Sequence, residues 1–324
     1  MPFIANTAEQ RREMLEVCGV DSVDELFVDI PEDLSPRSFD LPPARSEQET
    51  LSLFEHVAMQ NHGDLTVFIG AGFYDHYIPA AVDALSGRSE FVTAYTPYQP
   101  ELSQGTLQAI YEYQSQICRL TGLNAANASL YDGGTALYEA CQMALHATGR
   151  SRVVMDSGVN PVYRKMLYSY SANLAIDFAE APVVHGQSHR QTLFDLLDDE
   201  TAVVLLQNPN FFGAVDDHTD IVEHCHERGI LVVQSVYPIA LASVKSPGEM
   251  GVDIAVGEGQ SLGMPLAFGG PYLGFMACTG GKLIRKMPGR IAGRTVDQNG
   301  KESFVLTLQA REQHIRRAKA TSNI

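Results

Sequence analysis

The segment from Asp253 to Pro271 has the form of a cofactor-anchoring unit without its anchoring amine. It reads DIAVGEGQSLGMPLAFGGP: a short apolar strand, a polar glycine-rich turn, and a Gly-Gly-Pro that precedes another apolar strand. A lysine in such a unit can hold an aldehyde cofactor, because only an amine condenses with an aldehyde. Gln260 stands in that slot. Its amide cannot form the bond, so the sequence predicts a catalytic scaffold that lacks its central group.

A second group that such a cofactor needs is missing from the strand 229–236, which reads GILVVQSV. In the aspartate-aminotransferase fold, the tip of such a strand presents an aspartate that keeps the pyridine nitrogen of pyridoxal phosphate protonated. Gln234 stands here instead. An amide cannot stabilise a pyridinium by charge, so two independent positions indicate the same deficit.

The turn Gly133-Gly134-Thr135 follows Ser129-Leu-Tyr-Asp and opens a predicted helix. Free main-chain N–H groups and the positive end of the helix dipole favour a phosphate at such a turn, and the Thr135 hydroxyl adds a donor. Glycine turns before helices are also common without a ligand. Both interpretations, a phosphate seat and a plain turn, remain open at this point.

The loop Tyr95-Thr-Pro-Tyr-Gln-Pro-Glu101 combines two prolines with polar side chains. A stiff loop of this composition suits the positioning of a small polar ligand. Its candidate residues are Tyr95, Tyr98, Gln99 and Glu101. The alternative is a structural turn that packs its two rings.

Three other motifs favour ordinary structure. Gly70-Ala-Gly72 follows a predicted strand at 65–69, but Asp75 stands at the third glycine position of a dinucleotide-binding turn. His224-Cys225-His226 are adjacent on a predicted helix, so their side chains point in different directions and indicate a helix surface rather than a metal site. Ser157-Gly158 is preceded by Asp156 and does not form a GxSxG elbow, so this serine does not indicate a serine hydrolase.

The bulk composition is that of a soluble globular protein. Of the 324 residues, 45% are hydrophobic and 19% charged, and the formal net charge is −16. This charge argues against nucleic acid or an anionic membrane as a main partner. Five scattered cysteines form no CxxC pair, which indicates a reducing compartment. Without a predicted signal peptide or membrane span, we expect a cytoplasmic protein.

Alternating strands and helices predict an α/β fold with a mainly parallel sheet that is covered on both faces. The predicted strands are 152–155, 174–178, 202–207, 230–233, 253–256 and 273–277. The predicted helices begin at Thr7 and Ser46 and include 112–121, 135–147, 191–197 and 219–228.

We expect three parts along the chain. Residues 1–62 form an N-terminal helical arm and linker, and residues 63–290 form a large α/β domain. Residues 291–324 begin a small C-terminal domain, with a strand and then a charged helix between Ser303 and Lys319. Since no closing element follows, that domain is expected to be truncated.

Long segments of the chain closely resemble subunit 1 of the glycine-cleavage P protein, glycine dehydrogenase (decarboxylating). They are FIGAGFYDHYIP (68–79), YTPYQPELSQGTLQAIYEYQ (95–114), NASLYDGGTALYEA (127–140), SPGEMGVDIAVGEGQSLGMPLAFGGPYLGF (246–275), MPGRIAGRTVD (287–297) and REQHIRRAKATSNI (311–324). The resemblance spans nearly the whole chain. It implies the pyridoxal-phosphate-dependent transferase fold of the aspartate-aminotransferase type (fold type I), with a degenerate cofactor site.

The resemblance also implies a division of labour. P proteins condense glycine with pyridoxal phosphate, release carbon dioxide, and pass the aminomethyl group to the lipoyl arm of H protein. Subunit 2 carries the Schiff-base lysine and the ring-binding aspartate, so pyridoxal phosphate is expected in the partner and none is expected to be bound covalently here. Alignment on the shared Gly-Gly-Pro puts the partner's lysine at Gln260 and its aspartate at or beside Gln234.

The role that the resemblance implies for this chain is to complete the active-site wall or tunnel of subunit 2, and the chain is expected to be inactive alone. The candidate residues for that wall are Tyr95, Tyr98, Gln99 and Glu101. Two alternatives remain. A pseudoenzyme would only stabilise subunit 2. An autonomous enzyme would bind pyridoxal phosphate through another lysine, such as Lys245 or Lys282.

Overall fold

The computed structural model describes residues 5–31, 33–34, 38, 40–68, 70–72, 74–267 and 270–308. It divides into two compact units, Met1–Val67 and Phe68–Ile324. The charged helix predicted after Ser303 falls largely on residues 309–324, outside the described residues.

The first unit contains the helices α1 (Ala8–Cys18) and α2 (Glu47–Ala58) and the short 3-10 helix η1 (Asp24–Phe27). The sequence predicted both α-helices, and each begins at a reciprocal capping box. In α1, the Thr7 hydroxyl accepts from the Gln10 N–H at 3.2 Å, and the Gln10 side chain accepts from the Thr7 N–H at 2.9 Å. Neither helix buries a residue.

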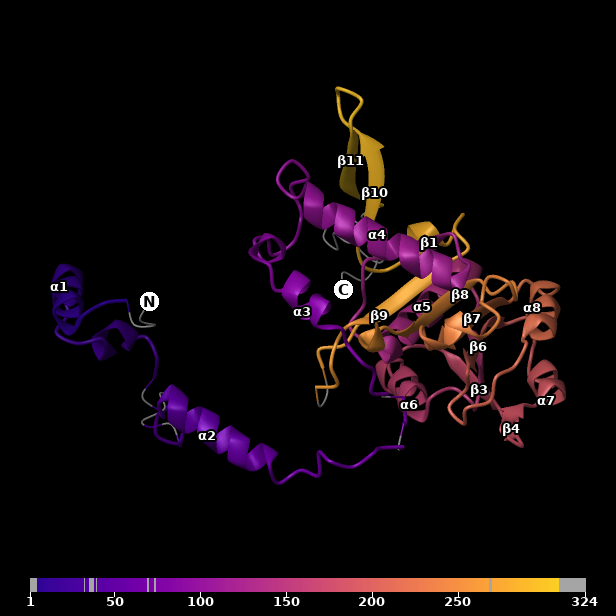
Figure 1. The fold of residues 1–324 in the computed structure, drawn as a ribbon, viewed down its shortest axis with the longest axis horizontal. Coiled ribbons are helices and arrows are strands. Elements are labelled where there is room, and N and C mark those ends of the chain that lie inside the picture. The colour runs from indigo at the N-terminus through magenta and orange to yellow at the C-terminus, as the bar shows by residue number, and fades with distance from the viewer. Residues whose placement is uncertain are drawn as a thin grey trace. The chain divides into compact units, whose positions relative to one another are not determined.

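The second unit is built on a seven-stranded sheet (Figure 1). In spatial order the strands are β1 (Ala125–Ala126), β9 (Gly274–Cys278), β8 (Ile254–Glu258), β7 (Leu231–Val236), β6 (Thr201–Asn208), β2 (Arg152–Asp156) and β3 (Asp177–Ala181). Strands β8, β7, β6, β2 and β3 are parallel, while β9 runs antiparallel to β8 and β1. The predicted α/β architecture with a mainly parallel sheet is therefore confirmed.

Alternate side chains of each central strand enter different cores. Val153 and Val233 pack with α5 (Gly133–Thr148) in one core, whereas Val154 and Val232 pack with α8 (Thr219–His226) in another. This is the period-two geometry of a strand buried on both faces. It also decides which residue at the end of β7 faces the site described below.

The remaining helices of the second unit are α3 (Ala80–Ser86), α4 (Gln104–Thr121), α6 (Pro161–Tyr170) and α7 (Arg190–Asp195). Short 3-10 helices lie at Ser89–Phe91 (η2), Ala240–Ala242 (η3), Gln260–Leu262 (η4) and Ile284–Lys286 (η5). A small hairpin joins β4 (Val183–Val184) to β5 (Gln187–Ser188). In the ranges that the structure describes, none of the helices has the length and apolar character needed to cross a membrane.

An antiparallel hairpin of β10 (Ile291–Val296) and β11 (Glu302–Thr307) packs beside α4 (Figure 1). The side chain of Gln104 joins them: its amide donates to the Phe304 carbonyl at 2.9 Å and accepts from the Phe304 N–H at 2.8 Å. The strand predicted from Ser303 onward is thus present, and its partner β10 was not predicted.

Two predicted strands are wrong in place or kind. The strand predicted at 174–178 occurs at 177–181, because a turn in which the Leu174 N–H donates to the Ser171 carbonyl occupies the earlier residues. No strand forms at 65–68, where Leu65, Val67 and Phe68 are exposed; Ile69, the last residue of that prediction, lies outside the described residues. An apolar run alone did not distinguish an exposed extended segment from a sheet strand.

Candidate functional site

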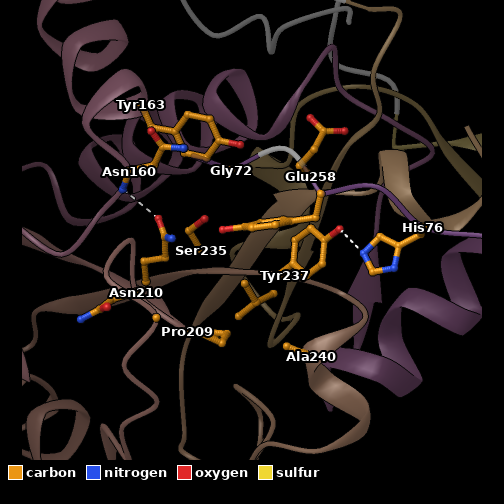
Figure 2. Close-up of a pocket in the computed structure, with 14 residues that line it drawn as sticks. Gly72, His76, Asn160, Tyr163, Pro209, Asn210, Ser235, Tyr237, Ala240 and Glu258 are labelled. Atoms are coloured by element: carbon orange, nitrogen blue, oxygen red, sulfur yellow. Dashed lines mark hydrogen bonds between the residues drawn. The ribbon is translucent and has the colours of Figure 1, made fainter. Parts of the chain in front are cut away.

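A cavity of about 320 Å³ opens at the carboxyl ends of the parallel strands (Figure 2). Gln207, Ser235 and Glu258 line it from β6, β7 and β8, and Asn160 and Tyr163 line it from the start of α6. In open α/β sheets, ligands commonly bind at this edge. No lysine or arginine is among the described residues that line the cavity.

Three aromatic side chains form one wall. The Tyr237 hydroxyl and His76 Nε2 lie 2.7 Å apart, and Figure 2 shows the two groups pointing toward one another. Their rings stack with centroids 5.7 Å apart, while Tyr74 meets Tyr237 edge-on at 5.0 Å. Burial raises the pKa of Tyr237 above its usual value, so its hydroxyl stays protonated and available as a donor.

The amide side chains of the cavity mainly hold the main chain. Asn160 caps α6 by accepting from the Val162 N–H at 2.9 Å. Asn210 accepts from the Phe212 and Ala214 N–H groups at 3.0 and 3.1 Å, and donates to the Gly186 carbonyl at 2.7 Å. These bonds fix the shape of the cavity. They also use hydrogen-bonding groups of Asn160 and Asn210 that could otherwise bind a ligand.

The turn Gly133-Gly134-Thr135 opens α5 as predicted, but donors of Gly133 and Thr135 bind carboxylates of the same chain. Asp132 accepts from the Thr135 N–H at 2.8 Å and from the Thr135 hydroxyl at 3.0 Å. Glu258 accepts from the Gly133 N–H at 2.9 Å. The phosphate seat and the plain turn were the two open interpretations, and these bonds favour the turn.

Gln260 lies in the first turn after β8 and is 4% exposed. Its main-chain N–H donates to Glu258 Oε1 at 3.0 Å, and its side-chain amide donates to the Met264 carbonyl. It is not among the residues that line the cavity. The slot expected to hold a lysine therefore holds a neutral amide that is tied to its own loop.

Gln234 is fully buried on the side of the sheet that packs against α8. Its amide lies 2.9 Å from Nδ1 of His218. Gln234 does not line the cavity, whereas the next two residues of β7, Ser235 and Val236, do. Because alternate residues of β7 face opposite sides, the cavity-facing position is beside Gln234 rather than at it. Burial lowers the pKa of His218, which keeps this buried pair neutral.

The four loop residues proposed as a shared wall lie at the surface and outside the cavity. Tyr95 is fully exposed, and Gln99 and Glu101 are also exposed. Tyr98 contacts Arg290: the guanidinium lies 5.8 Å from the ring centroid and donates to the hydroxyl at 3.5 Å. Tyr98 thus holds the loop against Arg290, while Tyr95, Gln99 and Glu101 are exposed.

Other motifs have structural roles. His226 lies 2.9 Å from Asp253, and His224 packs against the ring of Phe194 with centroids 4.2 Å apart. Within the part of the chain that the structure describes, no group of three or more His, Cys, Asp or Glu side chains could hold a metal ion.

Sequence analysis missed most of the residues that build the cavity: Tyr74, His76, Asn160, Tyr163, Ser235, Tyr237 and Glu258. Two of these residues lie in sequence patterns that could have identified them. Glu258 is a carboxylate at the end of an apolar strand, and Asn160-Pro161 is a helix-start pattern. His76 and Tyr237 are 161 positions apart, and nothing in the sequence pattern joins them.

Structural comparison defines the class. A sphingosine-1-phosphate lyase of Burkholderia pseudomallei superimposes with a TM-score of 0.57 at 13% identity, over 84% of this chain and 66% of that one, which shows the fold alone. A crystal structure of glycine decarboxylase (P-protein) of the glycine cleavage system, in inhibitor-bound form, superimposes with a TM-score of 0.91 at 44% identity. It covers all of this chain and 73% of that chain. The fold is that of pyridoxal-phosphate-dependent enzymes of fold type I.

Sequence comparison defines the family. The family model of the glycine cleavage system P-protein matches residues 1–324. Proteins named probable glycine dehydrogenase (decarboxylating) subunit 1 are 57% identical in Oleidesulfovibrio alaskensis and 59% identical in Geotalea uraniireducens, over 324 residues each. Both matches cover all of this chain and 73% of the relative. The chain belongs to the glycine cleavage system P-protein family and is a P-protein subunit.

P-proteins depend on pyridoxal phosphate, but the residues present here do not fit that cofactor. The position expected to supply an amine is Gln260, whose amide is bonded to the Met264 carbonyl. The expected phosphate seat contains the Glu258 carboxylate. The cavity therefore offers neither the covalent anchor nor the anion site that the cofactor requires.

Proposed function

We propose that this chain acts with a second P-protein subunit, glycine dehydrogenase subunit 2, to decarboxylate glycine and transfer the aminomethyl group to the lipoyl arm of H protein. The partner holds pyridoxal phosphate, and this chain holds none covalently. The observation that carries the proposal is the buried amide of Gln260 in the lysine slot. A chain without that amine needs another subunit for the chemistry.

The surface of the second unit supports a partner there. The segment from Phe68 to Leu102 exposes large apolar side chains that a monomer would ordinarily bury. Phe68 is 92% exposed, Tyr77 90%, Val92 74%, Tyr95 100% and Leu102 81%. Exposed apolar groups at this density are typical of a protein interface. The contribution of this chain is then a wall of the partner's active site, formed by Tyr95, Tyr98, Gln99 and Glu101.

The autonomous alternative has no support from the lysines considered for it. Lys245 Nζ binds Asp217 at 2.9 Å and the Thr219 hydroxyl at 2.8 Å, on an exposed turn. Neither Lys245 nor Lys282 lines the cavity. The scaffold alternative differs from the leading proposal only in whether the exposed loop affects the rate.

The division of labour is tested by locating the cofactor in the assembled heteromer. The complex is reduced with borohydride, which fixes a Schiff base irreversibly, and both chains are digested and analysed by mass spectrometry. The proposal predicts the cofactor mass on a lysine of the partner and on no peptide of this chain. A modified peptide that contains Lys245 or Lys282 would instead support the autonomous alternative.

A further inference from the structure

The carboxylate of Glu258 lies where the N-terminus of α5 would otherwise receive an anion. Oε2 accepts from the Gly133 N–H at 2.9 Å, and Oε1 accepts from the Gln260 and Leu273 N–H groups at 3.0 and 2.9 Å. Three main-chain donors from three segments converge on one side chain, which is 6% exposed. Converging main-chain N–H groups at a helix start form the usual geometry of a phosphate site.

A second carboxylate binds two further donors of the same helix turn. Asp132 binds the N–H and the hydroxyl of Thr135, at 2.8 and 3.0 Å. A further anion would therefore meet the buried carboxylate of Glu258 and the half-buried carboxylate of Asp132, whose repulsion water screens only in part. Burial raises the pKa of Glu258, the three N–H bonds oppose that rise, and the charge of Asp132 adds to it.

Side chains of α6 fill the space in front of the two glycines. A Cβ on Gly133 would lie 2.6 Å from the Tyr163 hydroxyl oxygen, and one on Gly134 would lie 2.6 Å from Met166 Sδ. The glycines are thus needed for close packing of α5 against α6.

We propose that Glu258 is an internal anion that fills the phosphate seat and excludes phosphate-bearing ligands from the cavity. This goes beyond the proposed function, because it concerns non-covalent binding by this chain alone. The two proposals are independent. Glu258 could fail to exclude phosphate even if the partner subunit holds the cofactor, and it could exclude phosphate even if the partner does not.

The test uses the full chain and two substitutions at one position. Glu258→Ala removes the carboxylate and leaves three converging N–H groups unpaired, whereas Glu258→Gln removes only the charge and keeps most of the volume. The control is Glu249→Ala. Glu249 also accepts from a main-chain N–H, that of Ser246 at 2.8 Å, but in an exposed turn. Inorganic phosphate binding is measured by titration calorimetry, and Tm is followed against phosphate with chloride at equal ionic strength as reference.

The proposal predicts that Glu258→Ala binds phosphate at least tenfold more tightly than the wild-type chain. Phosphate should raise the Tm of that variant more than chloride does, because a ligand that binds only the folded state stabilises it. The Gln variant should gain less, and the wild-type and Glu249→Ala chains should show no phosphate-specific change.

Two results would overturn the proposal. One is tight phosphate binding by both the wild-type chain and Glu258→Ala. The other is a folded Glu258→Ala variant whose phosphate affinity stays as weak as that of the wild-type chain. If Glu258→Ala does not fold, Glu258→Gln decides: any phosphate-specific gain supports an internal anion, and behaviour identical to the wild-type chain refutes it.

Discussion

His76 and Tyr237 join two distant parts of the chain through a contact of 2.7 Å between Nε2 and the phenol oxygen. The contact links the segment after Phe68 to the end of β7 and closes one side of the cavity. Tyr237→Phe keeps the ring stacking and removes the hydrogen bond. We expect the free energy of unfolding to fall by about 0.5–1.5 kcal/mol, measured by urea denaturation. Tyr131→Phe, at an exposed ring outside the cavity, should leave it unchanged, and equal effects of the two exchanges would contradict the role of the contact.

A Cβ at Gly72 would clash with the side-chain amide of Asn160. Its φ is +93°, and a Cβ would lie 2.6 Å from Asn160 Nδ2. Gly186→Ala provides the matched control, because its φ is +81° but no atom lies within 4 Å of the added Cβ. Both variants carry backbone strain of about 1–3 kcal/mol, so only the difference between them reports the contact. We expect Gly72→Ala to be the less stable in thermal unfolding, and equal Tm shifts would show that the Asn160 contact does not matter.

The exposed loop gives the sharpest distinction between an active-site wall and a scaffold. We expect Tyr98→Phe or Glu101→Gln to slow the glycine exchange reaction of the reconstituted heteromer by about tenfold, the effect of losing about 1.4 kcal/mol in the transition state. Glu112→Gln, an exposed carboxylate on α4 that accepts from Gln108 at 2.8 Å, serves as control. Wild-type rates for both loop variants would remove the loop from the mechanism and favour the scaffold.

Restoring the lysine alone should not restore cofactor binding. Position 260 does not line the cavity, so the lysine of Gln260→Lys would start from outside it. Glu258 would still accept from the Gly133 N–H, where the phosphate group would bind. We expect no visible absorbance band after incubation with pyridoxal phosphate. The double variant Gln260→Lys, Glu258→Ala is the comparison. A band in the single variant, abolished by borohydride, would show that the amide of Gln260 was the only obstacle.

Asp217 makes the chain sensitive to acid. Hydrogen bonds from the Thr219 hydroxyl and the Lys245 ammonium hold the pKa of Asp217 well below its ordinary value of 3.8. As pH falls, the unfolded chain therefore binds this proton before the folded chain does, so the stabilisation is complete above about pH 4 and is lost below it. Asp217→Asn should flatten the decline of the unfolding free energy with falling pH below about 4. An equally steep decline in Asp217→Asn would contradict this role of Asp217.

The sheet was predictable from sequence because its strands are short apolar runs separated by helices. Buried strands such as β6 carry the pattern along their whole length, and the capping boxes at Thr7 and Ser46 fixed two helix starts. The strand near residue 174 was misplaced because the turn bond from Leu174 to Ser171 has no apolar signature.

The cavity was less predictable because its walls come from residues far apart in the chain. The amide of Gln260 in the lysine slot could be predicted, since this depends on residue type alone. The contacts around the slot could not be predicted. That Ser235 rather than Gln234 faces the cavity depends on the register of β7 against its neighbours, and that Glu258 meets Gly133 depends on a contact across 125 positions.

The most direct test of the shared enzyme is reconstitution with subunit 2 and H protein, followed by glycine-dependent exchange of labelled carbon dioxide. We predict exchange in the mixture and none with either chain alone. Exchange by this chain alone would mean that Gln260 is not the relevant slot, and full exchange by subunit 2 alone would mean that this chain contributes nothing to the reaction.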